Sequence, residues 1–407
     1  MALSDQVAII GGGMVGLSLA HQLINRGISK KITIIEKESR LGMHTSGRNS
    51  GVLHAGIYYK PDSLKAKICI NGAQRLKEWI SENKLAINNC GKIIVPTSLH
   101  LDKQLDLLLE RGLSNGATCE IIDERELSKL SPLARSASGR ALWSPNTSVV
   151  DPCSILDTLQ KQLISYGVSI KLNEKTWKVL PSHNKIIFSD NSTLNYDYIF
   201  NCAGLYADKI AKLFNLSNEY ILIPFKGNYW RIKEKSNIKI STNLYPVPNL
   251  ELPFLGVHFT PSVRNQNTIY IGPTATLAFG RENYYKFDNL QPLDSLTNMS
   301  ILAQQYIFNR GRFREYFHRQ SLLTLKPLFL KAAQELIPTL TDQDIEFSSK
   351  VGVRPQLFNT NTNSIEDDFI CIKTASSFHV LNSISPAFTA SFAFADLIIN
   401  QSALVDN

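Results

Sequence analysis

The stretch VAIIGGGMVG, residues 7–16, decides the fold of the N-terminal part of the chain. It joins a short apolar run to glycines with the spacing G-x-G-x-x-G. Apolar residues with helical spacing follow from Leu17 to Ile24, and after Gly27 comes a second apolar run, Ile32 to Ile35. The pattern predicts a strand, a glycine-rich turn, a helix and a parallel strand, which is the βαβ unit that binds a dinucleotide.

Each glycine of the motif has a steric reason to be there. Gly11 permits the tight turn, Gly13 lets a pyrophosphate approach the backbone, and Gly16 lets the helix pack closely on the strand. Met14 and Val15 lie in the first turn of the predicted helix, whose free amide groups attract phosphate. We therefore predict that these residues bind the cofactor.

An acidic residue closes the unit after the second strand. Glu36 follows Gly16 by about 20 residues, where an acid accepts hydrogen bonds from a ribose 2′-hydroxyl. A carboxylate at that place would repel a ribose 2′-phosphate. The cofactor is therefore expected to be FAD or NAD rather than NADP.

Length and hydropathy indicate an ordinary globular protein. The chain has 407 residues, 43% hydrophobic and 19% charged, which is enough for a large core and, by length, two domains. No apolar run approaches the roughly 18 residues that span a bilayer, and the first strand leaves no room for a signal peptide. We therefore expect a cytoplasmic protein.

Charge and cysteine content limit the partners. The formal net charge is +8, but the lysines and arginines are dispersed, so no nucleic-acid partner is expected. An acidic substrate, or peripheral contact with the inner face of a membrane, would also suit a basic protein. The six cysteines form no C-x-x-C pair, so no metal site or dithiol centre is predicted. The sequence does not indicate an oligomeric state.

A polar, glycine-rich segment, HTSGRNSGVLHAGIYY, occupies residues 44–59. It is too polar to be core and directly follows the predicted cofactor-binding unit. We expect it to run along the dinucleotide and to bring His54 near the reactive end. The residues expected to contact the cofactor are Thr45, Ser46, Arg48, Asn49 and Ser50.

With KPDSLKAK at residues 60–67, this segment resembles the L-2-hydroxyglutarate dehydrogenase/oxidase family, within the D-amino-acid oxidase-like FAD superfamily. Three later runs resemble the same family in the same order: YPVP at 245–248, FLGVHFT at 254–260 and GPTATLAFGRE at 272–282. The resemblance implies that the cofactor is FAD. The chain departs from the family pattern at Lys226, Asn228 and Thr274, where arginine, an acid and asparagine are expected.

Two further segments are expected to reach the cofactor. An apolar strand ends in Ala203-Gly204, as in the second FAD-contacting motif of the superfamily, and small residues there allow close backbone approach. The segment SPAFT at 385–389 is expected to begin a helix that continues to Ile399. The resemblance places the N-terminus of this helix at the flavin pyrimidine, with Pro386, Ala387 and Thr389 as contacts.

The order of these patterns predicts an α/β fold with two domains. A Rossmann-like FAD-binding domain with a doubly wound parallel sheet is expected from residues 1–90, 145–215 and 348–407. Residues 91–144 and 216–347 lack βαβ alternation. There we expect a second, α+β substrate domain built on a largely antiparallel sheet.

The resemblance implies FAD-dependent oxidation of L-2-hydroxyglutarate to 2-oxoglutarate, with the electrons passed on to quinone or oxygen. Removing hydride from carbon 2 also requires a base for the hydroxyl proton, and histidine titrates near neutral pH. Two histidines lie inside the resembling motifs. His258 is the preferred base and His54 the alternative, while a purely structural role stays open for each.

Cations are expected to hold the two carboxylates of such a substrate. Arg354 is preferred, because a planar guanidinium can give a carboxylate two hydrogen bonds, and it is also expected to reach the cofactor. Arg281 and Lys226 are further candidates. Tyr245 and Tyr58 are candidate hydroxyl donors to the substrate.

Two other functions stay open. The same superfamily contains amine and amino-acid oxidases that act on glycine, sarcosine or D-amino acids. A non-metabolic flavoprotein associated with RNA is suggested only by the positive charge.

Overall fold

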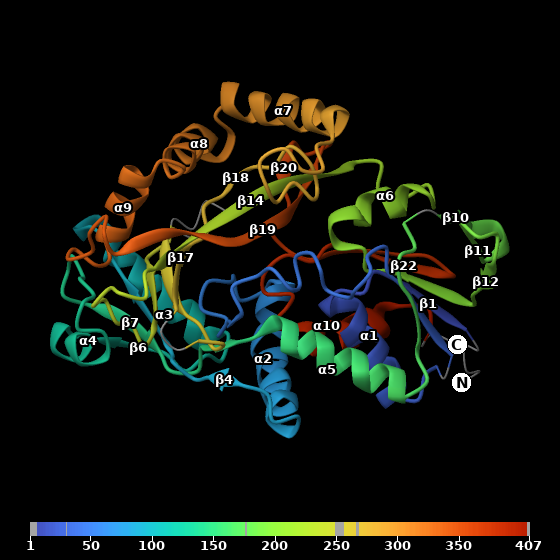
Figure 1. Cartoon of the computed structure of the whole chain (residues 1–407), viewed down its shortest axis with the longest axis horizontal. Helices are drawn as coiled ribbons and strands as arrows, with labels where there is room; N and C mark the ends of the chain where they lie inside the picture. Colours follow the sequence, from blue (N-terminus) through green and yellow to red (C-terminus); the bar gives the residue numbers. More distant parts are fainter. Residues whose placement is uncertain (1–5, 30, 176, 249–255, 266–267, 405–407) are drawn as a thin grey trace.

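The computed structural model describes residues 6–29, 31–175, 177–248, 256–265 and 268–404. Phe254 and Leu255, the first two residues of the FLGVHFT run, lie outside the described residues, as does Pro253 before them. In Figure 1 one sheet surrounds β1 on the right, and a longer sheet follows β14 and β19 toward the left. None of the helices in the described ranges is both long enough and apolar enough to span a bilayer.

The first sheet is built around β1 (Val7–Ile10), with the strand order β21-β22-β13-β1-β2-β9. Neighbouring strands are parallel except for β21 with β22. All four side chains of β1 are buried, as expected of a parallel strand covered on both faces. The other strands are β2 (Ile32–Ile35), β9 (Ser169–Lys171), β13 (Tyr198–Asn201), β21 (Ile370–Lys373) and β22 (Ser377–Asn382).

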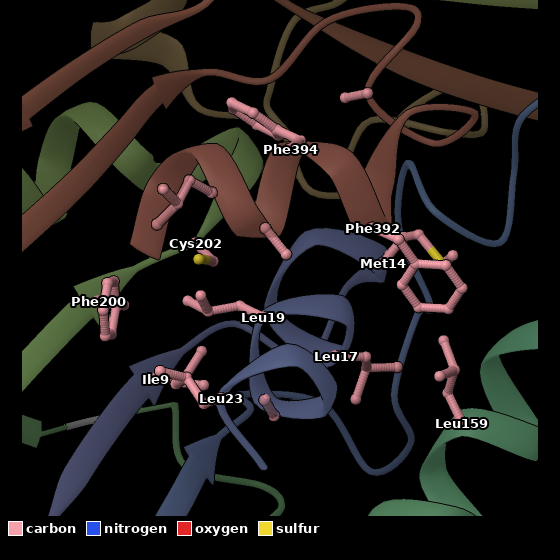
Figure 2. Close-up of a cluster of buried hydrophobic side chains, with 14 of the residues drawn as sticks. Ile9, Met14, Leu17, Leu19, Leu23, Leu159, Phe200, Cys202, Phe392 and Phe394 are labelled. Carbon is pink, nitrogen blue, oxygen red and sulfur yellow. The ribbon is translucent and has the colours of Figure 1, made fainter. Parts of the chain in front are cut away.

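Helices cover one face of this sheet. Figure 2 shows Leu17 of α1 directed toward Leu159 of α5, and Phe392 of α10 beside Met14. These side chains belong to one buried apolar cluster that also contains Ile9 of β1. The helices are α1 (Met14–Asn25), α5 (Pro152–Ser165) and α10 (Ser391–Gln401).

A small antiparallel sheet covers the other face. Ile186 and Phe188 of this sheet pack against Ala8 and Ile10 of β1 in a second buried cluster. With both faces covered, only the ends of the parallel strands can meet a ligand. The strands of this small sheet are β10 (Trp177–Leu180), β11 (Lys185–Phe188) and β12 (Thr193–Asn195).

The second large sheet has ten strands, and its pairs are antiparallel except for β5 with β15. Its long strands β14 and β19 pair with each other, and the register shifts at a bulge between Asn228 and Trp230. The strands are β5 (Lys92–Val95), β6 (Glu120–Ile122), β7 (Ala141–Ser144), β14 (Tyr220–Ile232), β15 (Asn243–Pro246), β16 (His258–Pro261), β17 (Ile269–Gly272), β18 (Thr276–Leu277), β19 (Ile345–Asn359) and β20 (Ser364–Ile365).

Further helices surround the two sheets. Along the upper edge of Figure 1 run α7 (Pro292–Ile307), α8 (Phe313–Leu322) and α9 (Lys326–Gln334). Elsewhere lie α2 (Leu64–Glu82), α3 (Lys103–Ser114), α4 (Glu124–Leu130) and α6 (Ala207–Lys212). A three-stranded sheet is formed by β3 (Val52–Leu53), β8 (Ser148–Val150) and β4 (Ile87–Asn88).

Local sequence explains where several helices begin. The Ser63 hydroxyl accepts a hydrogen bond from the Ala66 amide at 3.2 Å and caps α2. The carboxylates of Asp123 and Asp151 cap α4 and α5 in the same way. Serine and aspartate are residue types that favour the N-cap position, so each of these helix starts can be understood from the local sequence.

Gly72 lies in the middle of α2, where a glycine weakens a helix. A Cβ at this position would lie 2.5 Å from the Cα of Ala390, just before α10. The missing side chain therefore allows α2 to pack closely against the C-terminal segment.

The predicted fold class is confirmed, since a parallel sheet and a largely antiparallel sheet are both present. The predicted domain boundaries stay a prediction. Strand β19 remains paired in the ten-stranded sheet beyond residue 348, the position at which we expected the chain to return to the FAD-binding domain.

The expected start of the C-terminal helix is wrong. The chain turns after Ser385, and α10 begins only at Ser391. The amides of Ala387 and Ala390 donate to the carbonyls of Ile384 and Pro386 and close turns there.

Gly72→Ala should lower the free energy of unfolding by about 1–3 kcal/mol, because the new methyl group would collide with the backbone at Ala390. Chemical denaturation measures the change. Lys67→Ala, on the exposed side of the same helix, is the matched control. A Gly72→Ala protein as stable as the wild type would contradict this packing role.

Candidate active site

A cavity of about 760 Å³ lies where β1, β2, β13 and β22 end. Ligands of open α/β sheets bind at this edge, beyond the carboxyl ends of the strands. The wall contains most of the residues that sequence predicted for the site: Gly11, Gly13, Met14, Val15, Glu36, Thr45, Ser46, Arg48, Asn49, Ser50, His54, Ala203, Gly204, Tyr245, His258, Arg354, Pro386, Ala387 and Thr389.

The glycine turn fits a dinucleotide. Gly11 has a φ of +104°, and a Cβ on it would collide with the Cys202 carbonyl. A Cβ on Gly13 would lie 2.9 Å from the Ser46 hydroxyl, so the space beside the turn stays open only for glycine. Gly16 lies outside the cavity wall and packs against the Gly11 carbonyl, as its predicted packing role requires.

The start of α1 is free to receive a phosphate. Its N-cap, Gly13, offers no side-chain hydrogen bond. The Met14 amide donates to the Ser46 hydroxyl at 2.9 Å. The remaining amides of the first turn face the cavity end of the helix, where an anion is stabilised.

Glu36 is fixed by backbone groups at the end of β2. One carboxylate oxygen accepts from the Gly12 amide at 2.9 Å and the other from the Glu38 amide at 3.0 Å. The side chain is 8% exposed and lines the cavity. Each oxygen keeps a lone pair for the ribose hydroxyl that sequence predicted as its partner.

The polar segment after β2 lines the cavity, but its side chains mainly bind the protein backbone. Thr45 donates to the Val353 carbonyl at 3.2 Å, and Arg48 donates to the Met43 carbonyl at 2.8 Å. Asn49 donates to the Ser46 carbonyl at 2.7 Å. Thr389 accepts from the His54 amide at 3.2 Å and so joins this segment to the C-terminal turn. Direct contacts of these side chains with a cofactor stay a prediction.

His258, on β16, has a defined tautomer. Its Nδ1 lies 2.8 Å from the Gly256 carbonyl, which can only accept, so Nδ1 carries the proton and Nε2 keeps a lone pair. Burial lowers the pKa of His258 to about 4; the bond to Gly256 opposes this shift and the charge of Lys92 reinforces it. At neutral pH this histidine is therefore an unprotonated base.

His54 lies near His258. Burial, followed by the charges of Lys92, His258 and Arg354, lowers the pKa of His54 well below its ordinary value. Its Nδ1 is buried and has no hydrogen-bond partner among the described residues. An orphaned buried nitrogen at the cavity wall indicates that a ligand completes the site.

Arg354 brings a positive charge to the same part of the cavity. It lies on β19 opposite Phe225 of β14, and both residues line the wall. Burial lowers the pKa of its guanidinium, which nevertheless remains charged. The charge of Lys92 acts on both His54 and His258, and no carboxylate of the described residues contributes to the pKa of either histidine.

The structure does not bring Arg281 to the cavity wall. Its guanidinium forms a buried ion pair with Asp208, with distances of 2.5 and 2.8 Å. A buried carboxylate requires such a partner, so the guanidinium is already engaged. This corrects the substrate-binding role expected for Arg281.

Lys226 and Tyr58 also lie off the cavity wall. Side chains alternate along β14, so Phe225 and Gly227 face the cavity and Lys226 points away. Its ammonium lies 3.5 Å from the Tyr285 carbonyl. The Tyr58 hydroxyl is buried and has no partner within the described ranges.

Lys92 was missed by sequence analysis. It begins β5, is 1% exposed, and lies over the rings of Tyr58 and Tyr245. In sequence it is the lysine before an apolar strand, which is typical of a surface residue. Only the pairing of β5 with β15, which carries Tyr245, brings it behind the histidines.

Acidic residues gather elsewhere on the cavity wall. Glu38, His44 and Glu282 offer ligand atoms within 4.8 Å of one another. The Lys37 ammonium already bonds the carboxylates of Glu38 and Glu282. We therefore interpret this group as an ion-pair network.

The family described as FAD dependent oxidoreductase, DAO, matches residues 6–401. The chain belongs to this family. FAD is therefore its cofactor, as the resemblance implied; the glycine turn and Glu36 had left FAD and NAD open.

Curated relatives confirm the resemblance seen in the sequence. The L-2-hydroxyglutarate dehydrogenase of Indibacter alkaliphilus is 34% identical over 400 residues, which cover 97% of this chain and 97% of that protein. The mitochondrial L-2-hydroxyglutarate dehydrogenase of Homo sapiens is 34% identical over 425 residues, covering 98% of this chain and 88% of the human protein.

Solved structures share the fold at lower identity. The FAD-bound L-alpha-glycerophosphate oxidase from Mycoplasma pneumoniae has a TM-score of 0.73 at 21% identity, covering 100% of this chain and 96% of that chain. Glycine oxidase from Geobacillus kaustophilus has a TM-score of 0.70 at 17% identity, covering 98% and 94%.

An NMR titration of the histidine rings in the FAD-loaded protein should find His258 neutral at pH 6, with the proton on Nδ1. Burial lowers its pKa to about 4, so protonation follows only as the pH falls far below the ordinary value of 6.5. His258→Asn assigns the signal. A protonated ring at pH 6, or an Nε2–H tautomer, would contradict the proposed geometry.

Proposed function

We propose that this protein oxidises L-2-hydroxyglutarate to 2-oxoglutarate with FAD. One observation carries the proposal: a neutral His258, whose Nε2 keeps a lone pair, lines the cavity together with the guanidinium of Arg354. This arrangement suits a substrate that is negatively charged and must lose a hydroxyl proton. The relatives of the same name support the choice of substrate.

Each residue then has a role. Arg354 binds a substrate carboxylate with its planar guanidinium. Nε2 of His258 takes the proton of the 2-hydroxyl, and His54 is the alternative base. FAD, when bound, supplies the acceptor for the hydride that leaves carbon 2. The negative charge of the substrate raises the pKa of His258 from its low value and so favours proton transfer to it.

The alternative of an amine or amino-acid oxidase is less well supported. A substrate ammonium would lie near the positive charge of Arg354 on the cavity wall and that of Lys92 behind Tyr245. Like charges in a buried site repel strongly. The RNA-associated alternative has no comparable support in the cavity.

We further propose that the electrons pass to a membrane quinone at the inner face of the cytoplasmic membrane, rather than to oxygen. Helix α7 turns an apolar face outward: Leu293, Leu296 and Ile307 are 82%, 64% and 61% exposed. Its buried face contains the polar Asn298 and Gln305 as well as the apolar Ile301 and Leu302. A surface helix of a globular protein normally exposes polar side chains, so the exposed leucines and isoleucine of α7 are unusual.

The adjoining segment, residues 308–331, extends this surface along the edge shown in Figure 1. It exposes Phe308, Phe317, Leu322 and Leu325. It also has six lysines and arginines and one acidic residue, Glu315. Exposed apolar groups among cations fit an anionic lipid surface.

Anaerobic mixing with L-2-hydroxyglutarate should bleach the flavin absorbance, whereas glycine, sarcosine and D-amino acids should not. His258→Ala should keep FAD bound and slow the bleaching by roughly 10²-fold or more, because the proton acceptor is lost. His183→Ala, at an exposed histidine, is the control. Unchanged bleaching in His258→Ala would move the base to His54, and bleaching by amines alone would refute the substrate.

The FAD-loaded protein should co-sediment with vesicles that contain phosphatidylglycerol more than with phosphatidylcholine vesicles. Leu293→Asp combined with Leu296→Asp should weaken this binding about tenfold or more, because two exposed apolar side chains are lost. Leu99→Asp, at another exposed leucine, is the control. Equal binding of all three proteins would contradict a membrane role for α7.

A further inference from the structure

Lys92 is a buried cation with no carboxylate partner among the described residues. Its side chain is 1% exposed. The ammonium lies 4.6 Å from the centroid of the Tyr245 ring and 5.0 Å from that of Tyr58. Cation–π contacts of this kind offset only part of the cost of removing an ammonium from water.

The charge lies directly behind the candidate base. His258 stacks on the Tyr245 ring with 3.9 Å between the centroids, at an interplanar angle of 16°. Both rings line the cavity, whereas Lys92 does not. Its charge acts on both histidines, since it contributes to lowering the pKa of His54 and of His258. Arg354 also acts on His54.

Among the described residues, no group that faces Lys92 neutralises its charge. The nearby titratable groups include the thiols of Cys69 and Cys90, and burial raises their pKa values to about 12 and about 11. Both thiols are therefore uncharged at neutral pH. Burial lowers the pKa of Lys92 itself only to about 8, so the ammonium is mostly protonated at pH 7. An anion that enters the cavity is the missing counter-charge.

We propose that Lys92 is a positioning and specificity-determining residue of this site, whose buried charge favours a doubly negative substrate and, together with burial, disfavours protonation of His258 until that substrate binds. The proposal rests on the proposed function for the identity of the substrate. Lys92 acts through the Tyr245–His258 stack and the electric field, without touching the reacting atoms.

The test compares Lys92→Met with Lys350→Met in the FAD-loaded protein. Lys350 is a matched control, because it too lies over two tyrosine rings, at 5.2 and 4.4 Å, and burial lowers its pKa to about 8. It does not act on His54 or His258. Lys92→Arg keeps the charge and should stay near the wild type.

Two readouts separate a charge effect from a structural one. In Lys92→Met the NMR pKa of His258 should rise by about one pH unit, since a nearby positive charge is removed. The rate of flavin reduction divided by the substrate Kd should fall about tenfold more for L-2-hydroxyglutarate than for the monocarboxylate L-2-hydroxybutyrate. If the pKa of His258 is unchanged and the preference for L-2-hydroxyglutarate over L-2-hydroxybutyrate is also unchanged, the proposal is overturned.

A measurement on the unmodified protein applies even if Lys92→Met does not fold. The preference for the dicarboxylate over the monocarboxylate should decline as the pH rises through about 8, where Lys92 loses its proton. A preference that stays constant from pH 7 to 9 would overturn the proposal. The histidine titration needs no substrate, so it remains decisive if L-2-hydroxyglutarate is not oxidised.

Discussion

Close approach of backbone segments at the ends of the parallel strands is the constraint on which the site depends. A side chain on Gly11 would collide with the carbonyl of Cys202 at the end of β13, and one on Gly16 with the carbonyl of Gly11. Because neither glycine has a Cβ, the turn stays tight and the first turn of α1 stays open to the cavity. Strand packing and the phosphate binding predicted for this turn therefore depend on the same atoms.

The charged residues divide the cavity into two regions, one that suits the cofactor ribose and one that suits the substrate. Glu36 is held by backbone amides and suits a ribose, while the Lys37 ammonium pairs with the carboxylates of both Glu38 and Glu282 nearby. In the part of the cavity with His258 and Arg354, the charge that acts on His258 is that of Lys92, and no carboxylate of the described residues contributes there. This uneven distribution supports the proposal that the ribose-binding region, which contains the acidic residues, adjoins a separate pocket for a dianion.

Sequence predicted the features that depend on neighbours along the chain. The glycine spacing, Glu36 and the helix caps at Ser63 and Asp151 required only local geometry, and the structure contains each of them. The resembling motifs indicated His258, but its tautomer depends on the Gly256 carbonyl and its burial. No spacing pattern reports such a bond.

Other features depend on strand pairing and packing, which the sequence does not reveal. The sequence offers Arg281 as a candidate substrate cation, and only the fold brings Asp208 beside it as an ion-pair partner. Lys226 and Phe225 are neighbours, yet the strand turns only one of them to the cavity. Lys92 and Gly72 acquire their roles from β15 and from the segment before α10.

A crystal structure of the FAD-loaded protein with 2-oxoglutarate would test the central claim most directly. The account predicts one carboxylate on the guanidinium of Arg354 and the 2-oxo oxygen within hydrogen-bond reach of Nε2 of His258. A ligand held by Lys226 or Arg281 outside the cavity, or one whose 2-oxo group faces away from both histidines, would contradict it.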